Sequence, residues 1–132
     1  MTIISESIQM YLVNIIRLGE DGQPVPLSLL AETLSFSPVS VHEMCRKLQE
    51  QAFVVYRPYK GVSLTAEGER IACYILRRHR LWEVFLVDKL GFMYDEAHEV
   101  ACALEHATPD ILTDRLDTFL GFPTVNSAGQ PI

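Results

Sequence analysis

The stretch A-F-V-V-Y-R-P-Y-K-G-V-S-L-T, residues 52–65, predicts a strand, a turn and a second strand. The turn is P-Y-K-G (58–61), and both arms are rich in β-branched and aromatic residues. A helix is expected next, because Thr65 is a suitable N-cap and acidic residues in the following turn favour the helix dipole. Lys60 lies at the tip of this hairpin, where its charge can contact a backbone phosphate.

Two short helices are predicted before the hairpin. The first is L-S-L-L-A-E-T-L (27–34), and the second is V-S-V-H-E-M-C-R-K-L-Q-E-Q (39–51). The turn between them contains a serine that can cap and a proline that suits the first helical position. Three leucines of the first helix are expected to face inward: Leu29, Leu30 and Leu34. Helix, turn, helix and hairpin together predict a winged-helix DNA-binding domain.

In such a domain the second helix presents its N-terminal residues to base edges in the major groove. The candidate readers are two serines and a glutamate that can accept from a cytosine amine, whereas the basic residues are better placed for phosphate. The predicted DNA contacts are Ser37, Pro38, Ser40, Glu43, Arg46, Lys47 and Lys60.

Helices dominate the remainder of the chain. One is expected over 5–18, opening with capping serines, and a long one runs from about residue 66 until Gly91 ends it. Two more are predicted over 94–108 and from Pro109 until Gly121. Helices in 66–120 carry more apolar surface than they can hide, which indicates a dimer.

The predicted fold is therefore mainly α with one small β-hairpin. We expect an N-terminal winged helix-turn-helix domain over 1–73. An all-helical domain for dimerisation and metal binding is expected over 74–132.

The metal prediction comes from H-E-V-A-C-A-L-E-H (98–106). On a continuous helix His98, Cys102, Glu105 and His106 share one face, and a thiol, a carboxylate and two imidazoles have the composition of a transition-metal site. Cys102 stands where the zinc-protease pattern H-E-x-x-H has its second histidine, so that pattern is absent. The alternative is an amphipathic helix with a polar edge.

The other candidate metal ligands can also be explained without a metal. His79 and Glu83 are i, i+4 neighbours, which is also the spacing of a surface hydrogen-bonded pair. Met10 lies on the first helix, where a methionine commonly fills a gap in a core.

The cysteines, the N-terminal sequence and the charge distribution indicate where the protein is found and what it can bind. Three widely spaced cysteines do not form a disulfide framework, and the N-terminus lacks the pattern of a signal peptide, so we expect a cytoplasmic protein without a membrane span. The net charge is −6, yet residues 42–80 hold eight Lys/Arg against four Glu, and residues 81–132 hold two against nine acids. A basic middle part is compatible with phosphate contact despite the acidic total.

The chain resembles the metal-dependent repressors of the diphtheria toxin repressor and manganese transport regulator family. The likeness rests on S-P-V-S-V-H-E-M (37–44), P-Y-K-G-V-S-L-T-A-E-G (58–68), R-R-H-R-L-W-E-V-F-L (77–86) and H-E-V-A-C-A-L-E-H (98–106). It implies a homodimer that binds palindromic double-stranded operator DNA when loaded with a divalent metal, and that represses metal-uptake or homeostasis genes. The length suggests the two-domain form that lacks the SH3-like domain.

The resemblance also implies ligands. The primary set would be Met10, Cys102, Glu105 and His106, and the ancillary set His79, Glu83 and His98. The manganese branch has Asp and Glu in place of Met10 and Cys102. Because sulfur ligands favour Fe(II), Co(II), Ni(II) or Zn(II) over Mn(II), we expect Fe(II). No ligand is expected in the C-terminal V-N-S-A (125–128), which we expect to run over the surface.

Three alternative functions share some of these features. A Mn(II)- or Zn(II)-responsive member of the same family is one. A winged-helix regulator that responds to a redox or organic signal through Cys102 is another. The third is a metallohydrolase, which needs an open coordination position and a general base beside it; Glu99 lies about 100° round the helix from His98, which disfavours this function. We therefore expect no enzymatic activity.

Overall fold

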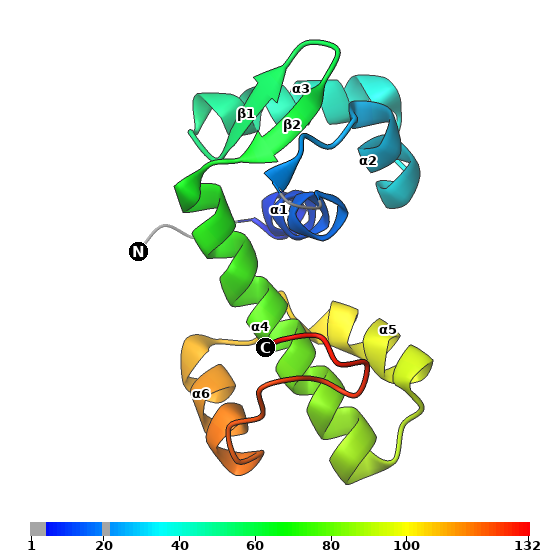
Figure 1. Cartoon of the computed structure of the whole chain (residues 1–132), viewed down its shortest axis with the longest axis vertical. Helices are drawn as coiled ribbons and strands as arrows, with labels where there is room; N and C mark the ends of the chain where they lie inside the picture. Colours follow the sequence, from blue (N-terminus) through cyan, green and yellow to red (C-terminus); the bar gives the residue numbers. More distant parts are fainter. Residues whose placement is uncertain (1–4, 20–21) are drawn as a thin grey trace. The chain divides into compact units, whose positions relative to one another are not determined.

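The computed structural model describes residues 5–19 and 22–132, and the chain divides into two compact units, Met1–Cys73 and Tyr74–Ile132 (Figure 1). The elements in chain order are α1 (Glu6–Leu18), α2 (Leu27–Leu34), α3 (Pro38–Glu50), β1 (Val54–Arg57), β2 (Gly61–Leu64), α4 (Ala66–Leu90), α5 (Tyr94–Leu104) and α6 (Asp110–Phe119). The boundary between the units falls within α4. The prediction of a mainly helical chain with one hairpin is confirmed.

Side-chain caps begin three of these helices as predicted. Ser5 Oγ accepts from the Ile8 amide at 3.2 Å, and Ser37 Oγ accepts from the Ser40 amide at 3.1 Å. Thr65 Oγ1 accepts from the backbone amide three residues later, also at 3.1 Å. Each cap satisfies an amide that the helix itself leaves without a partner.

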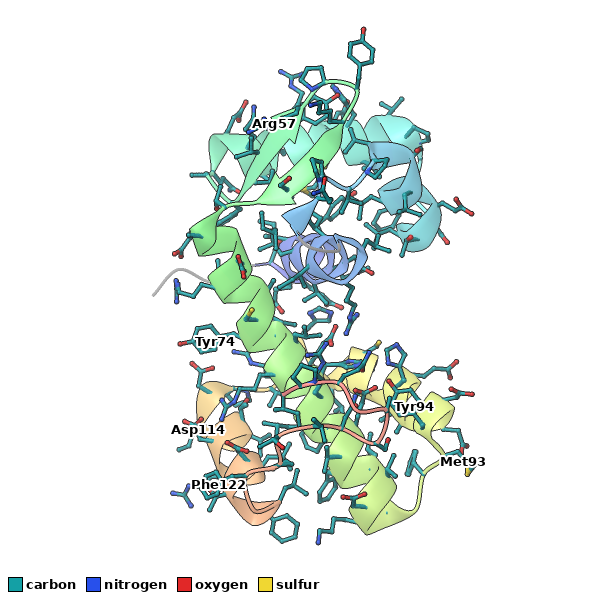
Figure 2. All side chains as sticks on the ribbon, viewed as in Figure 1. Arg57, Tyr74, Met93, Tyr94, Asp114 and Phe122 are labelled. Atoms are coloured by element: carbon teal, nitrogen blue, oxygen red, sulfur yellow. The ribbon has the colours of Figure 1, made fainter. Side chains whose placement is uncertain are left out.

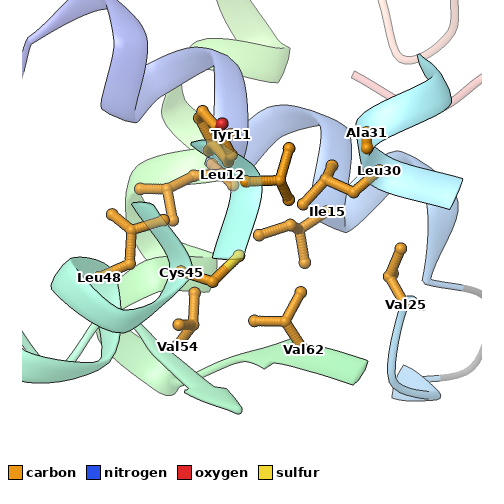
Figure 3. Close-up of a cluster of buried hydrophobic side chains, with 12 residues drawn as sticks. Tyr11, Leu12, Ile15, Val25, Leu30, Ala31, Cys45, Leu48, Val54 and Val62 are labelled. Carbon is orange, nitrogen blue, oxygen red and sulfur yellow. The ribbon is translucent and has the colours of Figure 1, made fainter. Parts of the chain in front are cut away.

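The core of the first unit gathers apolar side chains from α1, α2, α3 and the hairpin (Figure 3). From α3 the buried residues are Val41, Cys45 and Leu48, as their helical spacing predicts. The prediction that Leu29 faces inward is wrong, since it is 39% exposed. Leu30 and Ala31 occupy the inward face of α2, and Leu29 is turned about 100° away from Leu30.

The hairpin is an antiparallel pair in which Val54 lies opposite Leu64. A second contact fixes it to the body of the unit, because Val25 and Val62 exchange both backbone hydrogen bonds, at 2.8 and 2.9 Å. The close approach of the hairpin backbone to Val25 requires glycine at position 61, where φ is +121°. A Cβ there would lie 2.1 Å from the Val25 carbonyl oxygen.

Gly61→Ala is therefore expected to lower the free energy of unfolding of the first unit by at least about 2 kcal/mol, from backbone strain and steric overlap together. Chemical denaturation followed by circular dichroism measures the change. Gly22→Ala is the control, because Gly22 also has a positive φ (+74°) but a Cβ there would meet nothing within 4 Å. Equal destabilisation by the two substitutions would show that the contact with Val25 is unimportant.

In the second unit, ion pairs connect side chains of α6 with side chains of α4. Arg77 pairs with Asp114 at 3.3 Å and with Asp117 at 3.0 Å, while Arg78 pairs with Asp110 at 2.9 Å. Large apolar side chains of this unit remain exposed: Tyr74, Leu90, Met93, Ile111, Leu112, Phe119, Phe122 and Val125. Figure 2 labels three of them, Tyr74, Met93 and Phe122. Their surplus agrees with the predicted dimer. Among the described helices, none is long and apolar enough to cross a membrane.

Candidate metal centre and nucleic-acid interface

The second unit buries an unusual number of polar side chains. His79 and Glu83, one turn apart on α4, are only 2% and 0% exposed, so the alternative of a surface pair is wrong. Glu105 and Asn126 are buried beside them, at 3% and 4% exposed. Buried charges are costly unless they are paired or hold a metal, so this cluster requires a chemical reason.

Three ligand atoms at the centre of the cluster form a nearly equilateral triangle. His79 Nε2 lies 3.0 Å from His98 Nδ1 and 3.2 Å from Glu83 Oε2, and the last two atoms are 3.0 Å apart. An ion that binds three such atoms at about 2.1 Å and at right angles holds them about 3.0 Å from one another. The triangle therefore has the dimensions of one face of a metal's ligand shell.

Glu105 and His106 reach the cluster from beyond the end of α5. The predicted helix over 94–108 is too long, because the regular helix stops at Leu104 and a turn follows. The Glu105 amide still donates to the Ala101 carbonyl at 2.9 Å, which turns its carboxylate inward. Its Oε2 lies 2.8 Å from His79 Nδ1, and its Oε1 lies 3.3 Å from His106 Nε2.

Cys102 lies beside both imidazoles of the cluster, those of His98 and His79. Its Sγ lies 3.8 Å from His98 Nε2, the ring nitrogen that faces away from the triangle, as the i, i+4 spacing predicts. One ligand atom each from His79, His98 and Cys102 can be chosen so that all lie within 4.8 Å of one another. The His98 side chain is 44% exposed, and an open hollow lined by Tyr94, Asp95, His98 and Glu99 borders it. An ion could approach from this side.

The charges in the cluster stabilise one another. Burial alone would raise the pKa of Glu83, but hydrogen bonds from His79, His98 and Asn126 lower it to about 2. Burial alone would lower the pKa of His79, but contacts with Cys102, Glu105 and Glu83 raise it to about 10. The positive charge of the His79 imidazole and the negative charge of the Glu83 carboxylate therefore stabilise each other.

Residues of the two predicted ligand sets contact one another. His79 of the ancillary set touches Glu105 of the primary set, and His98 touches Cys102. Met10, the remaining primary residue, is half-buried on α1 of the first unit, where its carbonyl accepts from Asn14 Nδ2 at 2.8 Å. The contacts that define the cluster all lie within the second unit.

Asn126 is the residue that the sequence reasoning missed. The C-terminal V-N-S-A was expected on the surface without a role at the site, yet Asn126 is buried and its Nδ2 donates to Glu83 Oε1 at 2.9 Å. An asparagine in a turn-rich tail carries no periodic signal, so its burial could not be seen in the sequence.

The predicted DNA contacts all lie on exposed surface in the first unit, on α3, its N-cap or the hairpin turn. The two serines bond one another, Ser37 Oγ to Ser40 Oγ at 2.9 Å. Two exposed residues next to the predicted ones were not anticipated. Val39, on the first turn of α3, is 68% exposed, and Tyr59, beside Lys60 at the hairpin tip, is fully exposed. Apolar residues at outward helical positions were the available signal for Val39.

Two family models match most of the chain. Residues 3–62 match the family model "Iron dependent repressor, N-terminal DNA binding domain", and residues 65–132 match "Iron dependent repressor, metal binding and dimerisation domain". The chain is 38% identical over 118 residues to an uncharacterized HTH-type transcriptional regulator of Methanocaldococcus jannaschii, covering 89% of this chain and 94% of that protein.

Two characterised relatives are longer than this chain. The iron-dependent repressor IdeR of Mycobacterium leprae is 31% identical over 127 residues, which are 96% of this chain and 55% of IdeR. A structure described as a manganese-dependent transcriptional repressor in complex with manganese superimposes with a TM-score of 0.87 at 42% identity, covering 95% of this chain and 57% of that one. The chain thus spans little more than half the length of either.

Proposed function

This chain belongs to the iron-dependent repressor family of metal-dependent transcriptional repressors, and we propose that Fe(II) is the metal that activates it. Loaded with Fe(II), a homodimer binds palindromic operator DNA and represses metal-uptake or homeostasis genes in the cytoplasm. Residues 1–73 bind the DNA, and residues 74–132 bind metal and form the dimer. The observation that carries the proposal is the buried cluster of imidazoles, carboxylates and a thiol around His79 and Glu83.

The ligand assignment follows the two sets predicted from the sequence. His79, Glu83 and His98 form the ancillary site, which the 3.0–3.2 Å triangle of their ligand atoms supports. Met10, Cys102, Glu105 and His106 form the primary site. Because Met10 lies in the first unit and Cys102, Glu105 and His106 lie in the second, an ion bound by all four would couple metal ligation to protein conformation.

This coupling explains how the ion acts as a switch. The primary ligands come from both units, so an ion bound by all four holds the units in one arrangement. That arrangement places the two recognition helices of the dimer in successive major grooves. A preference of the ion for this arrangement by about 1.4 kcal/mol changes the equilibrium tenfold.

The identity of the metal rests on the chemistry of the ligands. Two sulfur atoms, from Met10 and Cys102, favour Fe(II), Co(II), Ni(II) or Zn(II) over Mn(II), which prefers oxygen. Intrinsic affinity ranks nickel and zinc above iron, so availability in the cell selects Fe(II). A Mn(II)- or Zn(II)-responsive repressor is the alternative within the family.

The proposal is tested by an anaerobic gel shift with palindromic promoter DNA and Fe(II), Mn(II), Zn(II) or a chelator. Fe(II) at micromolar concentration is expected to produce the complex, and the chelator to abolish it. Strongest activation by Mn(II) would overturn the choice of iron. Binding that ignores chelators but responds to oxidants would instead support a redox regulator that uses Cys102.

Lys60→Ala tests the hairpin as a phosphate contact. Because a phosphate contact carries no sequence information, binding to operator and to unrelated DNA should weaken by a similar factor. The slope of log affinity against log salt should decrease by about 1, measured by fluorescence anisotropy. Lys89→Ala, which removes the same charge from an exposed position on α4, is the control. An unchanged salt slope in Lys60→Ala would exclude the contact.

A further inference from the structure

The C-terminal segment, residues 124–132, folds back on itself in a small closed loop. Thr124 and Ile132 are joined by a backbone hydrogen bond of 3.0 Å, and Val125 pairs with Pro131 in an antiparallel bridge. Inside the loop the Asn126 amide donates to the Gln130 carbonyl, also at 3.0 Å. Asn126 is the buried residue of this loop.

The side chain of Asn126 uses all of its hydrogen-bonding capacity. Oδ1 accepts from the amides of Ala128 at 3.0 Å and Gln130 at 2.9 Å. Nδ2 donates to Gln130 Oε1 and to Glu83 Oε1, both at 2.9 Å. Because two backbone amides require an acceptor at Oδ1, the NH2 group can only face Glu83.

The hydrogen bond from Asn126 fixes the orientation of the Glu83 carboxylate. Its carboxylate is fully buried, with Oε1 held by Asn126 and Oε2 directed at His79 Nε2 and His98 Nδ1. One oxygen is thus engaged by the tail, and the other completes the triangle. Without Asn126, Oε1 would lose its buried donor and the carboxylate would be free to rotate.

The loop also contacts the two helices that carry the triangle. The Arg80 guanidinium on α4 donates to the Pro131 carbonyl, and the Tyr94 hydroxyl on α5 donates to Gln130 Oε1 at 3.3 Å. The loop is therefore attached next to His79 and Glu83 on one side and near His98 on the other.

We propose that Asn126 is a positioning residue of the metal site, which fixes Glu83 for an ion at His79, Glu83 and His98 and thereby couples ion binding to docking of residues 124–132. The inference rests on the proposed function, since it concerns the ancillary site of that proposal. By reciprocity, an ion that holds Glu83 must stabilise the docked loop, and the docked loop must raise the affinity for the ion.

Asn126→Ala tests whether Asn126 fixes Glu83 for the ion. Co(II) is titrated calorimetrically, and the binding step of this site is identified as the one weakened in Glu83→Gln. Asn126→Ala is expected to weaken that step 10- to 100-fold, as removal of a partner of a metal ligand commonly does. Ser127→Ala, a change at the exposed neighbouring position, should leave it within about twofold. An unchanged affinity in Asn126→Ala would overturn the proposal.

A double variant distinguishes the positioning of Glu83 by Asn126 from a merely structural role of Asn126. If Asn126 acts through Glu83, Asn126→Ala should have no further effect on residual Co(II) binding in the Glu83→Gln background. Full additivity of the two losses would contradict the positioning role. Failure of the wild-type chain to bind Co(II) at all would overturn the proposed function as well, whereas normal wild-type binding that Asn126→Ala does not change would overturn this inference alone.

Hydrogen exchange tests the coupling without any substitution. The amides of residues 126, 128, 129, 130 and 132 donate within the loop, so their exchange reports its docking. Co(II) is expected to slow their exchange at least about tenfold in the wild-type chain, matching the change in affinity. Equal exchange with and without Co(II) would show that the loop and the site are independent.

Discussion

Replacing Cys102 by alanine is expected to abolish metal-dependent operator binding. The Cys102 sulfur is the proposed soft ligand in the second unit's cluster. Loss of this ligand should weaken Fe(II) activation at least about 100-fold, more than the loss of a residue that only supports a ligand. The measurement is an anaerobic fluorescence-anisotropy titration of labelled operator DNA at increasing Fe(II).

The same variant should fold normally without metal. Cys102 is half-buried and contacts the cluster at its margin, 3.8 Å from His98 Nε2. Circular dichroism and the unfolding midpoint of the metal-free protein should therefore remain close to wild type. Asp88→Ala, at an exposed position on α4, is the control and should retain the full Fe(II) response. A Cys102→Ala protein with that full response would refute the metal-sensor mechanism.

The largest effect on stability is expected from His79→Ala. This imidazole lies between Glu83 Oε2 at 3.2 Å and Glu105 Oε2 at 2.8 Å, and all three residues are almost completely buried. Removing it leaves two buried carboxylates without their shared counter-charge, which costs about 3–5 kcal/mol in comparable sites. The single tryptophan, Trp82, lies in the second unit, so its fluorescence during urea denaturation reports unfolding there.

His42→Ala is the matched control for that experiment. His42 is an exposed imidazole on α3 whose ring meets the edge of Tyr56, and its loss should hardly change the unfolding midpoint. If metal-free His79→Ala were as stable as wild type, the carboxylates would have to be stabilised by groups other than this imidazole. The cluster would then not depend on His79 in the absence of metal.

The sequence by itself determined the features that depend on near neighbours. Caps at Ser5, Ser37 and Thr65 and the hairpin were predicted correctly, because each follows from residues within a few positions of one another. The pairing of His98 with Cys102 was also predictable, since one helical turn separates them.

Only the tertiary structure decided which polar side chains become buried. His79 and Glu83 have the spacing of a surface pair as well as of a buried one, and packing of α5 and the tail against α4 settled the question. Glu105 keeps the helical backbone one residue past Leu104, but its contact with His79 depends on how α5 packs against α4. Asn126 reaches Glu83 across 43 positions of sequence. Burial depends on which distant segments cover a residue, and local periodicity holds no information about that.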